Sequence, residues 1–171
     1  MFTNKPLSEL LGQGIRLREI RQSDAEAILL IRNDNIVNTY VDRAPTKNLD
    51  ESIAFINSRI EGNKSGSGYY WVISLENDQN LLGTICLWNV DRNDLSTEVG
   101  FELFPQYQKK GIMRRALQLV MHFGFDELDL HKINAYVHPK NKDSINLLLR
   151  SGFKNTQDPE NTNLLKFEKI R

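Results

Sequence analysis

The sequence has 171 residues, 40% hydrophobic and 26% charged, and its 22 basic and 22 acidic residues cancel. This length suits one compact domain, so we expect a single domain over residues 1–171. Zero net charge argues against a nucleic-acid-binding protein, since such domains usually carry a net basic footprint. The single cysteine, Cys86, excludes an internal disulfide and a multi-cysteine metal cluster, and the three histidines show no metal-ligand spacing.

Membrane and export signals are weak in this sequence. Its longest apolar runs, such as 28–31 and 147–149, are far shorter than the roughly 18 residues that a spanning helix needs. The stretch from Met1 to Pro6 lacks the hydrophobic core of a secretory signal. We therefore expect a cytoplasmic protein that does not associate with a membrane.

The first third of the chain predicts one strand followed by helices. Residues 7–11 predict a short helical turn, and residues 15–20, which alternate apolar and charged side chains, predict a strand with one buried face. Ser23 with Glu26 three residues later is a capping-box pattern for a helix that ends at 33–35.

A second helix follows an irregular or helical piece over 36–41. It is capped by Asn48 or Asp50 and closed by Gly62, after which the glycine- and serine-rich residues 62–68 predict a flexible loop. The remaining expected elements are strands at 69–75, 81–88 and 96–104, a helix from about 111, a strand at 132–137, a helix that starts at Asn141, Asp143 or Ser144 and stops at Gly152, a turn around 158–161 and a strand over about 164–167. This order predicts an α/β fold with a mixed central sheet of about six to seven strands and helices on both faces.

The helix expected from residue 111 has its charges at unfavourable ends. Lys109, Lys110, Arg114 and Arg115 crowd its start, where the helix dipole is positive, and no acid occurs from 103 to 125. An anion at the helix start would reverse this penalty, because free backbone N–H groups, a glycine and cations together bind phosphate. The pattern predicts a phosphate or pyrophosphate site, although a solvated basic turn before a core helix would show the same charges.

Three motifs in this order resemble the GNAT superfamily of N-acetyltransferases. The run Gln108-Lys109-Lys110-Gly111-Ile112-Met113 resembles the Q/R-x-x-G-x-G/A acyl-coenzyme A signature, with Met113 in the place of Gly or Ala. The run Asn141-Lys142-Asp143-Ser144, followed by an apolar helix and Gly152-Phe153, resembles the second motif. Together with Glu98 to Leu103 leading into Pro105-x-Tyr107, the pattern is most similar to the RimJ/RimL branch, whose best-known members acetylate the N-termini of ribosomal proteins.

This resemblance implies acetyl-CoA as co-substrate. Its pyrophosphate would lie on the loop and helix start, and its pantetheine arm would run beside the preceding strand, where two strands splay. Asn141 matches the family position that binds the arm from the far side, and it is also a common helix cap. The implied coenzyme-binding residues are Phe101, Glu102, Leu103, Gln108, Lys109, Lys110, Gly111, Ile112, Met113, Arg114 and Asn141.

Glu98 is the candidate catalytic base. On an alternating strand Glu98, Gly100 and Glu102 share one face, and Gly100 would leave room for an amine beside the carboxylate. An exposed strand carboxylate is the alternative. Many GNAT enzymes have a tyrosine that serves as the general acid at the position of Leu148. Ser144 is therefore a candidate proton donor to the leaving thiolate, and its alternative role is that of a helix-start residue.

Other side chains receive no catalytic role. Trp71 and Trp88 are expected in the core or in cross-strand pairs. Among the histidines, only His138, at the end of a strand, is placed where it could reach the cleft.

The expected function is direct acetyl transfer from acetyl-CoA to a primary amine, either a protein N-terminal α-amine or a small-molecule amine. A catalytically weak or inactive acyl-CoA-binding or regulatory module is the alternative, favoured by Leu148 and Met113. An acidic pocket would favour a polyamine or an aminoglycoside. The acids available for one are Asp34, Asp42, Asp50 and Glu51, which a solvated surface explains equally well. A homodimer is possible by family resemblance, and no metal is expected.

Overall fold

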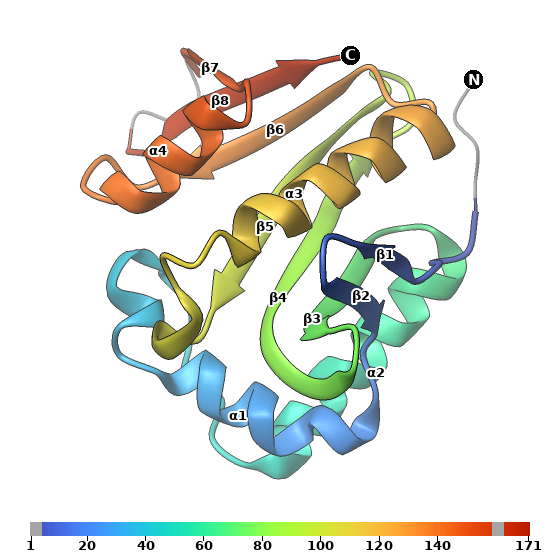
Figure 1. Ribbon diagram of the computed structural model, residues 1–171, viewed down its shortest axis with the longest axis vertical. Helices are drawn as coiled ribbons and strands as arrows, with labels where there is room; N and C mark the ends of the chain where they lie inside the picture. Colours follow the sequence, from blue (N-terminus) through green and yellow to red (C-terminus); the bar gives the residue numbers. More distant parts are fainter. Residues whose placement is uncertain (1–4, 159–162) are drawn as a thin grey trace.

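The computed structural model describes residues 5–158 and 163–171 and contains a mixed sheet with helices on both faces (Figure 1). The strands are β1 (Leu10–Gly12), β2 (Ile15–Glu19), β3 (Tyr69–Leu75), β4 (Asp78–Asp91), β5 (Ser96–Leu103), β6 (Lys132–Val137), β7 (Lys154–Thr156) and β8 (Leu165–Ile170). The helices are α1 (Ala25–Asn33), α2 (Leu49–Ser65), α3 (Ile112–His122) and α4 (Lys142–Arg150). Shorter turns are the 3-10 helices η1 (Gln22–Asp24), η2 (Val37–Tyr40) and η3 (Pro105–Tyr107) and the π-helical turn η4 (Phe123–Glu127).

The strands lie in the order β1-β2-β3-β4-β5-β6-β8-β7. All neighbouring pairs are antiparallel except β5 and β6, which are parallel and are connected through α3. The parallel pair is short, because its register ends at Glu98 opposite Asn134. Beyond that pair the two strands diverge (Figure 1).

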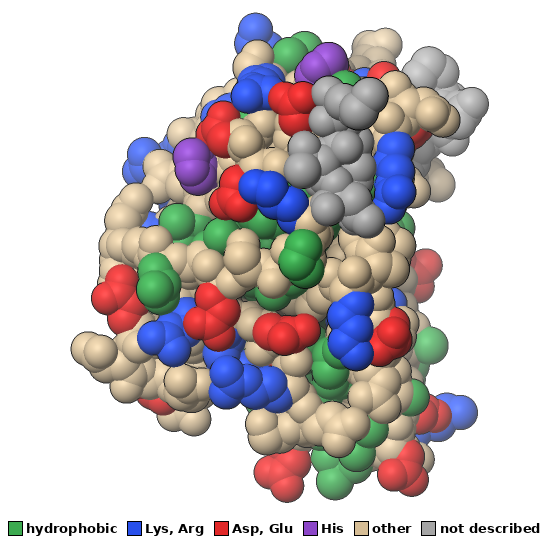
Figure 2. Space-filling model, turned by 90° about the vertical axis from the view of Figure 1, so that its right-hand side faces the viewer, with side chains coloured by type: hydrophobic (Ala, Val, Ile, Leu, Met, Phe, Trp, Pro, Cys, Tyr) green, Lys and Arg blue, Asp and Glu red, His purple; other side chains and the backbone are tan. Residues whose placement is uncertain are grey.

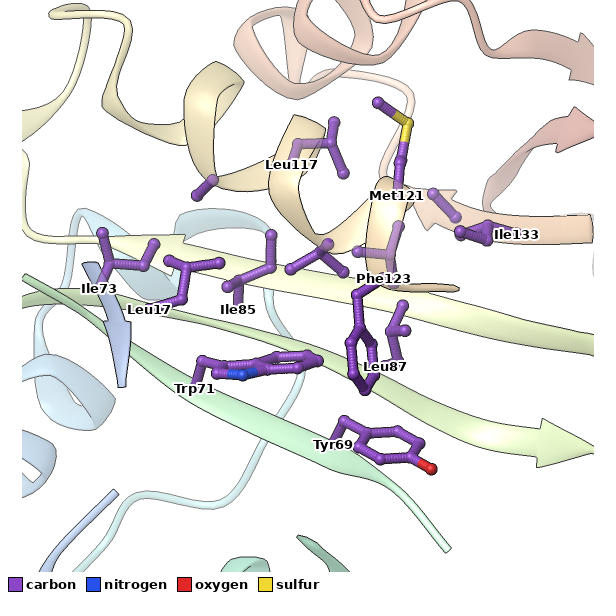
Figure 3. Packing of buried hydrophobic residues seen from close by; sticks show 14 of the residues in the cluster. Leu17, Tyr69, Trp71, Ile73, Ile85, Leu87, Leu117, Met121, Phe123 and Ile133 are labelled. Atoms are coloured by element: carbon purple, nitrogen blue, oxygen red, sulfur yellow. The ribbon is translucent and has the colours of Figure 1, made fainter. Parts of the chain in front are cut away.

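Helices α3 and α4 pack on one side of the sheet, which we call the α3 face. Its core is apolar and aromatic: Trp71 and Phe123 are fully buried, with ring centroids 5.2 Å apart in an edge-to-face arrangement (Figure 3). Tyr69 contacts both rings. Such pairs add about 0.5–1.5 kcal/mol to the gain from burial alone.

Helices α1 and α2 pack on the opposite side, the α1–α2 face. Ile28, Ile31 and Ile56 are fully buried there against strand residues that include Tyr70 and Val72. Tyr70 and Val72 alternate with Trp71 on β3, so a single strand contributes to both cores.

Most of the predicted elements are confirmed, and the differences have local causes. The sheet has eight strands rather than six or seven, because two short strands, β1 and β7, join its edges. Residues 10–12 pair with β2 instead of forming a helical turn. Ser23 does not cap α1, since the Asp24 carboxylate accepts a hydrogen bond from the Arg21 N–H at 2.8 Å and bridges to Arg18.

Helix α2 also differs at its end. Its N-terminal cap is Asn48, whose Oδ1 accepts a hydrogen bond from the Glu51 N–H at 2.9 Å. The sequence had left Asn48 and Asp50 as alternatives for this cap. The helix runs past Gly62 to Ser65 and ends at Gly66, whose φ of 67° is the left-handed conformation that favours glycine. The predicted turn around 158–161 lies mostly outside the described residues.

Basic and acidic side chains are interspersed on the face shown in Figure 2, in keeping with the zero net charge. In the part of the chain that the structure describes, no helix has both the length and the apolar composition to cross a membrane. Within the same residues, no three His, Cys, Asp or Glu side chains come together as a metal site.

Candidate active site

The opening between β5 and β6 is the centre of the candidate site. Hydrogen bonding between parallel strands stops after the Glu98–Asn134 pair, although β5 continues to Leu103 and β6 to Val137. Backbone groups of β5 beyond Glu98 are therefore left without a strand partner on that side. A polar, extended ligand could satisfy them.

The register with β4 decides which β5 residues face the opening. The Phe104 N–H donates to the Leu82 carbonyl at 3.0 Å, so every second residue before it, including Glu102, also points its backbone groups at β4. Val99 and Phe101 point the other way, into the opening. Glu102, expected as a backbone partner of the arm, is thus wrongly oriented for that role. The Leu103 carbonyl already accepts a hydrogen bond from Gln108 Nε2 at 2.9 Å.

The loop before α3 brings a helix N-terminus to the same place. Lys109 has φ 60° and Gly111 has φ 74°, two left-handed residues that turn the chain sharply into the helix. No described atom lies within 4 Å of the position that a Gly111 Cβ would take. The first intrahelical bond runs from the Arg115 N–H to the Gly111 carbonyl, so the preceding N–H groups have no helical acceptor.

The charges around this N-terminus match the predicted pattern. The first turn of α3 contains no acid, and Arg114 is exposed. Lys109 and Lys110 are also exposed; Lys109 Nζ lies 3.8 Å from the Asp143 carboxylate, a weak surface pair. Arg115 differs, since its guanidinium donates to the Gln13 carbonyl at 2.6 Å. Three exposed cations thus surround an uncapped helix start.

The two remaining residues of the loop motif anchor the helix. Ile112 is buried in the core of the α3 face, and Met113 is half-buried against it. Since its side chain packs rather than points to solvent, Met113 in the place of a smaller residue leaves the helix start intact.

The start of α4 lies on the other side of the opening (Figure 1). Asn141 caps this helix, because its Oδ1 accepts the Ser144 N–H at 3.2 Å. The Ser144 side chain is half-buried in the first turn. Leu148 is fully buried in the core of the α3 face, so the position of the family tyrosine holds a packing residue.

Glu98 lies on the α1–α2 face, at the point where β5 and β6 part. Its carboxylate accepts a hydrogen bond from Asn89 Nδ2 at 2.7 Å. Asn134, opposite Glu98 in register, has a buried Oδ1 with no hydrogen-bond partner among the described residues. An unsatisfied buried acceptor beside a carboxylate is suited to a ligand that donates hydrogen bonds, such as an amine.

Gly100 leaves less free space than expected. A Cβ there would lie 3.2 Å from Cys86 Sγ and 3.7 Å from Trp88 Nε1. Trp88, opposite Glu98 on β4, is 49% exposed, whereas Trp71 is 0% exposed. The two tryptophans thus occupy the core and the cross-strand positions that the sequence predicted, and the indole of Trp88 borders the site.

A charged cluster on the α1–α2 face joins the sheet to the α1–α2 connection. Arg43 Nη1 contacts the Glu102 carboxylate at 2.8 Å, with side chains 17% and 12% exposed, and Thr84 Oγ1 donates to the same carboxylate at 3.4 Å. Arg32 Nε donates to Thr46 Oγ1 at 2.9 Å. Burial, and secondarily the charge of Arg43, lowers the pKa of Arg32 below its ordinary value. These contacts hold residues 43–46 against the site.

The proposed acidic pocket is not built from the residues named for it. Asp34 uses its carboxylate on the N–H groups of Ile36 and Val37, at 2.8 and 2.9 Å. Asp42 and Asp50 are exposed, and Glu51 accepts the Lys47 N–H. The same connection places the Tyr40 ring on His138, with ring centroids 5.2 Å apart, so His138 lies against the α1–α2 connection.

Sequence reasoning missed several residues of this region. Val99 could have been inferred from strand alternation once Phe101 was assigned to the arm. Asn134, Arg43 and Arg59 carry no local signal, because their placement depends on strand register and on how α1 and α2 dock.

This chain is similar in sequence and in fold to known acetyltransferases. Residues 15–154 match the family described as "Acetyltransferase (GNAT) domain". The probable N-acetyltransferase YjcK of Bacillus subtilis is 30% identical over 156 residues, 84% of this chain and 82% of that protein. The crystal structure of the ribosomal-protein-S5-alanine acetyltransferase of Vibrio fischeri superposes with a TM-score of 0.81 at 25% identity, over 95% of this chain and 96% of that one. Spermidine N-acetyltransferase of Vibrio cholerae, solved with CoA and spermine, shares the fold with a TM-score of 0.80 at 21% identity, over 92% and 95% of the chains.

Proposed function

Since this chain belongs to the GNAT acetyltransferase family and is an N-acetyltransferase, we propose that it transfers the acetyl group of acetyl-CoA directly to a primary amine. The observation that carries the proposal is the convergence of three features on one opening: the divergence of β5 and β6, the uncapped start of α3, and the carboxylate of Glu98. The acceptor is a small-molecule amine or a protein N-terminal α-amine.

The coenzyme half of the site is built largely from backbone. The N–H groups at the start of α3, with Lys109, Lys110 and Arg114 around them, would hold the pyrophosphate. Gly111 leaves open space for that approach. The backbone groups of Val99 and Phe101 would pair with the amides of the pantetheine arm, with Asn141 on the opposite side.

Glu98 acts as general base in this proposal. Its carboxylate, oriented by Asn89, accepts a proton from the acceptor ammonium or amine, either directly or through water. The side-chain Oδ1 of Asn134 accepts a hydrogen bond from a second N–H of the acceptor and so orients the nitrogen lone pair. A β5 backbone N–H in the opening donates to the carbonyl oxygen as negative charge develops on it. The C–S bond breaks as the C–N bond forms.

Proton return to the leaving thiolate has one side-chain candidate. Ser144 lies in the first turn of α4, where the helix dipole also favours an anion. With Leu148 in the core, the alternative is departure of the thiolate without a dedicated acid. Family resemblance supports, within the same proposal, one catalytic domain over residues 1–171, a cytoplasmic location and a homodimer.

The substitution Glu98→Gln tests the enzyme against a non-catalytic coenzyme-binding module. We expect a loss of about a hundred- to ten-thousandfold in acetyl transfer, measured by release of free CoA, with the affinity for acetyl-CoA unchanged. Glu61→Gln, which removes one exposed carboxylate from α2, is the matched control. Equal turnover in Glu98→Gln and Glu61→Gln would contradict the role of Glu98. Coenzyme binding by the wild type without turnover on any amine would favour the non-catalytic module.

A further inference from the structure

A hollow of about 240 Å³ lies on the α1–α2 face, between the C-terminal half of α2 and strands β3 and β4. With roughly 30 Å³ for each water molecule in the liquid, it has room for about eight. Trp88 and Asn89, both exposed, form its rim, so a solute can enter from solvent. None of the candidate coenzyme-binding residues described above lines it.

Arg59 is the one charged side chain among the described residues that line this hollow, and no carboxylate lines it. Its Nε atom is buried and lacks a hydrogen-bond partner. Within the described part of the chain, Arg59 forms no ion pair either; its guanidinium lies over the Phe55 ring, 4.9 Å from the centroid. A partly buried cation without a counter-charge is costly, and an incoming anion would remove that cost.

Two other arginines of this face have partners, whereas Arg16 on β2, whose buried Nε also lacks a hydrogen-bond partner, does not line the hollow. Arg43 pairs with Glu102, and Arg32 binds Thr46. The polar neighbour Asn63 is also satisfied, because its amide donates to and accepts from the backbone of Tyr70. Among the buried side-chain polar atoms of the described residues that line the hollow, Arg59 Nε is the one without a hydrogen-bond partner.

The hollow adjoins the candidate reacting centre through Cys86 and Asn89. Cys86 lines it, and the Sγ of Cys86 lies 3.2 Å from where a Gly100 Cβ would stand. Asn89, on its rim, donates to Glu98. Both the Arg59 cation and the Glu98 carboxylate are close enough to the Cys86 thiol to influence its pKa. One ligand can therefore reach Glu98 with one end and Arg59 with the other.

We propose that the acceptor of this enzyme is a small amine that also carries an anionic group, a carboxylate or a phosphate, which Arg59 binds in this hollow while the amine lies beside Glu98. The inference rests on the proposed function and narrows its substrate class. It disfavours polyamines, since a polycation would meet an arginine without a counter-charge in this hollow, and no carboxylate among the described lining residues. The guanidinium would bind the anion through charge-assisted hydrogen bonds.

The test compares amine acceptors that differ only in the anionic group. Glycine, β-alanine and 4-aminobutyrate are assayed against their carboxamides, 2-aminoethyl phosphate against ethanolamine, and spermidine alongside. We expect at least one anionic acceptor to exceed its neutral partner in kcat/KM by about tenfold or more, and Arg59→Gln to abolish that ratio. Lys64→Gln, which removes a cation from the exposed side of the same helix, should retain it. Comparing the carboxylate acceptors with 2-aminoethyl phosphate identifies which anionic group is bound.

A second measurement does not depend on catalysis. The N-acetylated products of the same acids and amides are titrated into the CoA-loaded protein by calorimetry, with wild type and Arg59→Gln compared and folding checked by circular dichroism. Tighter binding of the acetylated acids or phosphate, lost in Arg59→Gln, supports the proposal. Two results would overturn the proposed anionic acceptor and leave the acetyltransferase assignment standing. One is a preference for the neutral partners or for spermidine. The other is equal binding of acid and amide by a protein that does bind CoA. Failure to bind CoA at all would overturn the proposed function as well.

Discussion

The two faces of the central sheet each contain an apolar core, and they differ in the charged side chains that the shared strands carry. On the α3 face, Trp71 and Phe123 belong to an apolar core without charged members. On the α1–α2 face, the neighbouring strand positions carry Glu98, Glu102 and Cys86, with arginines from the helices and their connection above them. Strand alternation thus places the acceptor half of the site one residue away from the core of the α3 face, so that core supports it from the other side of the sheet.

The largest expected difference in stability between the two faces is that between Trp71 and Trp88, which lie on adjacent strands. Trp71→Ala should destabilise the protein by about 3–5 kcal/mol, because a fully buried indole is lost and the Ser8 carbonyl loses its donor at 2.9 Å. Trp88→Ala, at a 49% exposed position, should cost less than about 1 kcal/mol. Urea unfolding followed by circular dichroism measures both. Equal losses for the two variants would show that the faces do not differ as described.

The Arg43–Glu102 pair tests whether the site face is held by charge. Removing one partner from a largely buried pair leaves the other unpaired, so Arg43→Met should cost about 2–3 kcal/mol at these exposures. Adding Glu102→Gln should recover part of that loss, because the orphaned charge is then gone. A double-mutant cycle in urea measures the coupling. Strict additivity of the two single changes would contradict a stabilising contact between them.

The contribution of Cys86 to stability depends on pH. Burial raises the pKa of this thiol from 9.0 to about 12, with the charge of Glu102 adding to the rise. Folding therefore favours the protonated thiol: the stability it contributes is present below pH 9 and is lost as pH rises toward 12. Wild type should lose unfolding free energy more steeply than Cys86→Ala between pH 9 and 11.

Labelling of the same thiol by iodoacetamide provides an independent reading. Cys86 is half-buried, so the reagent can reach it, yet the protonated thiol should react slowly at pH 8 in the folded protein and much faster in urea. A native labelling rate that levels off near pH 9 would show that the thiol keeps its ordinary pKa.

The coenzyme half of the site stays a prediction, and its sequence signals are local. The left-handed Gly111, the cations at Lys109 and Arg114, and the alternation of β5 all lie within one continuous stretch. Even there, the resemblance implied Glu102 as a backbone partner of the arm, whereas its backbone groups point at β4, because the pairing register with β4 cannot be read from the sequence.

The acceptor half could not be predicted for the same reason. Arg43 meets Glu102 across 59 positions of sequence, and Arg59 reaches the hollow only because α2 docks over β3 and β4. Acidic residues that looked available, such as Asp34, are used to hold their own turn. Side chains of this kind acquire their partners through tertiary contacts, so composition alone does not decide the charge of the acceptor site.

Calorimetric titration with acetyl-CoA measures directly whether the coenzyme binds at the start of α3. Wild type is compared with Lys109→Glu/Arg114→Glu, and with Lys64→Glu/Lys154→Glu as a control of equal charge change at exposed positions. The account predicts micromolar binding by wild type and control, and at least about a hundredfold weaker binding by the first variant, since two cations beside the pyrophosphate become repulsive. Equal affinity in all three folded proteins would contradict the assignment of the coenzyme site.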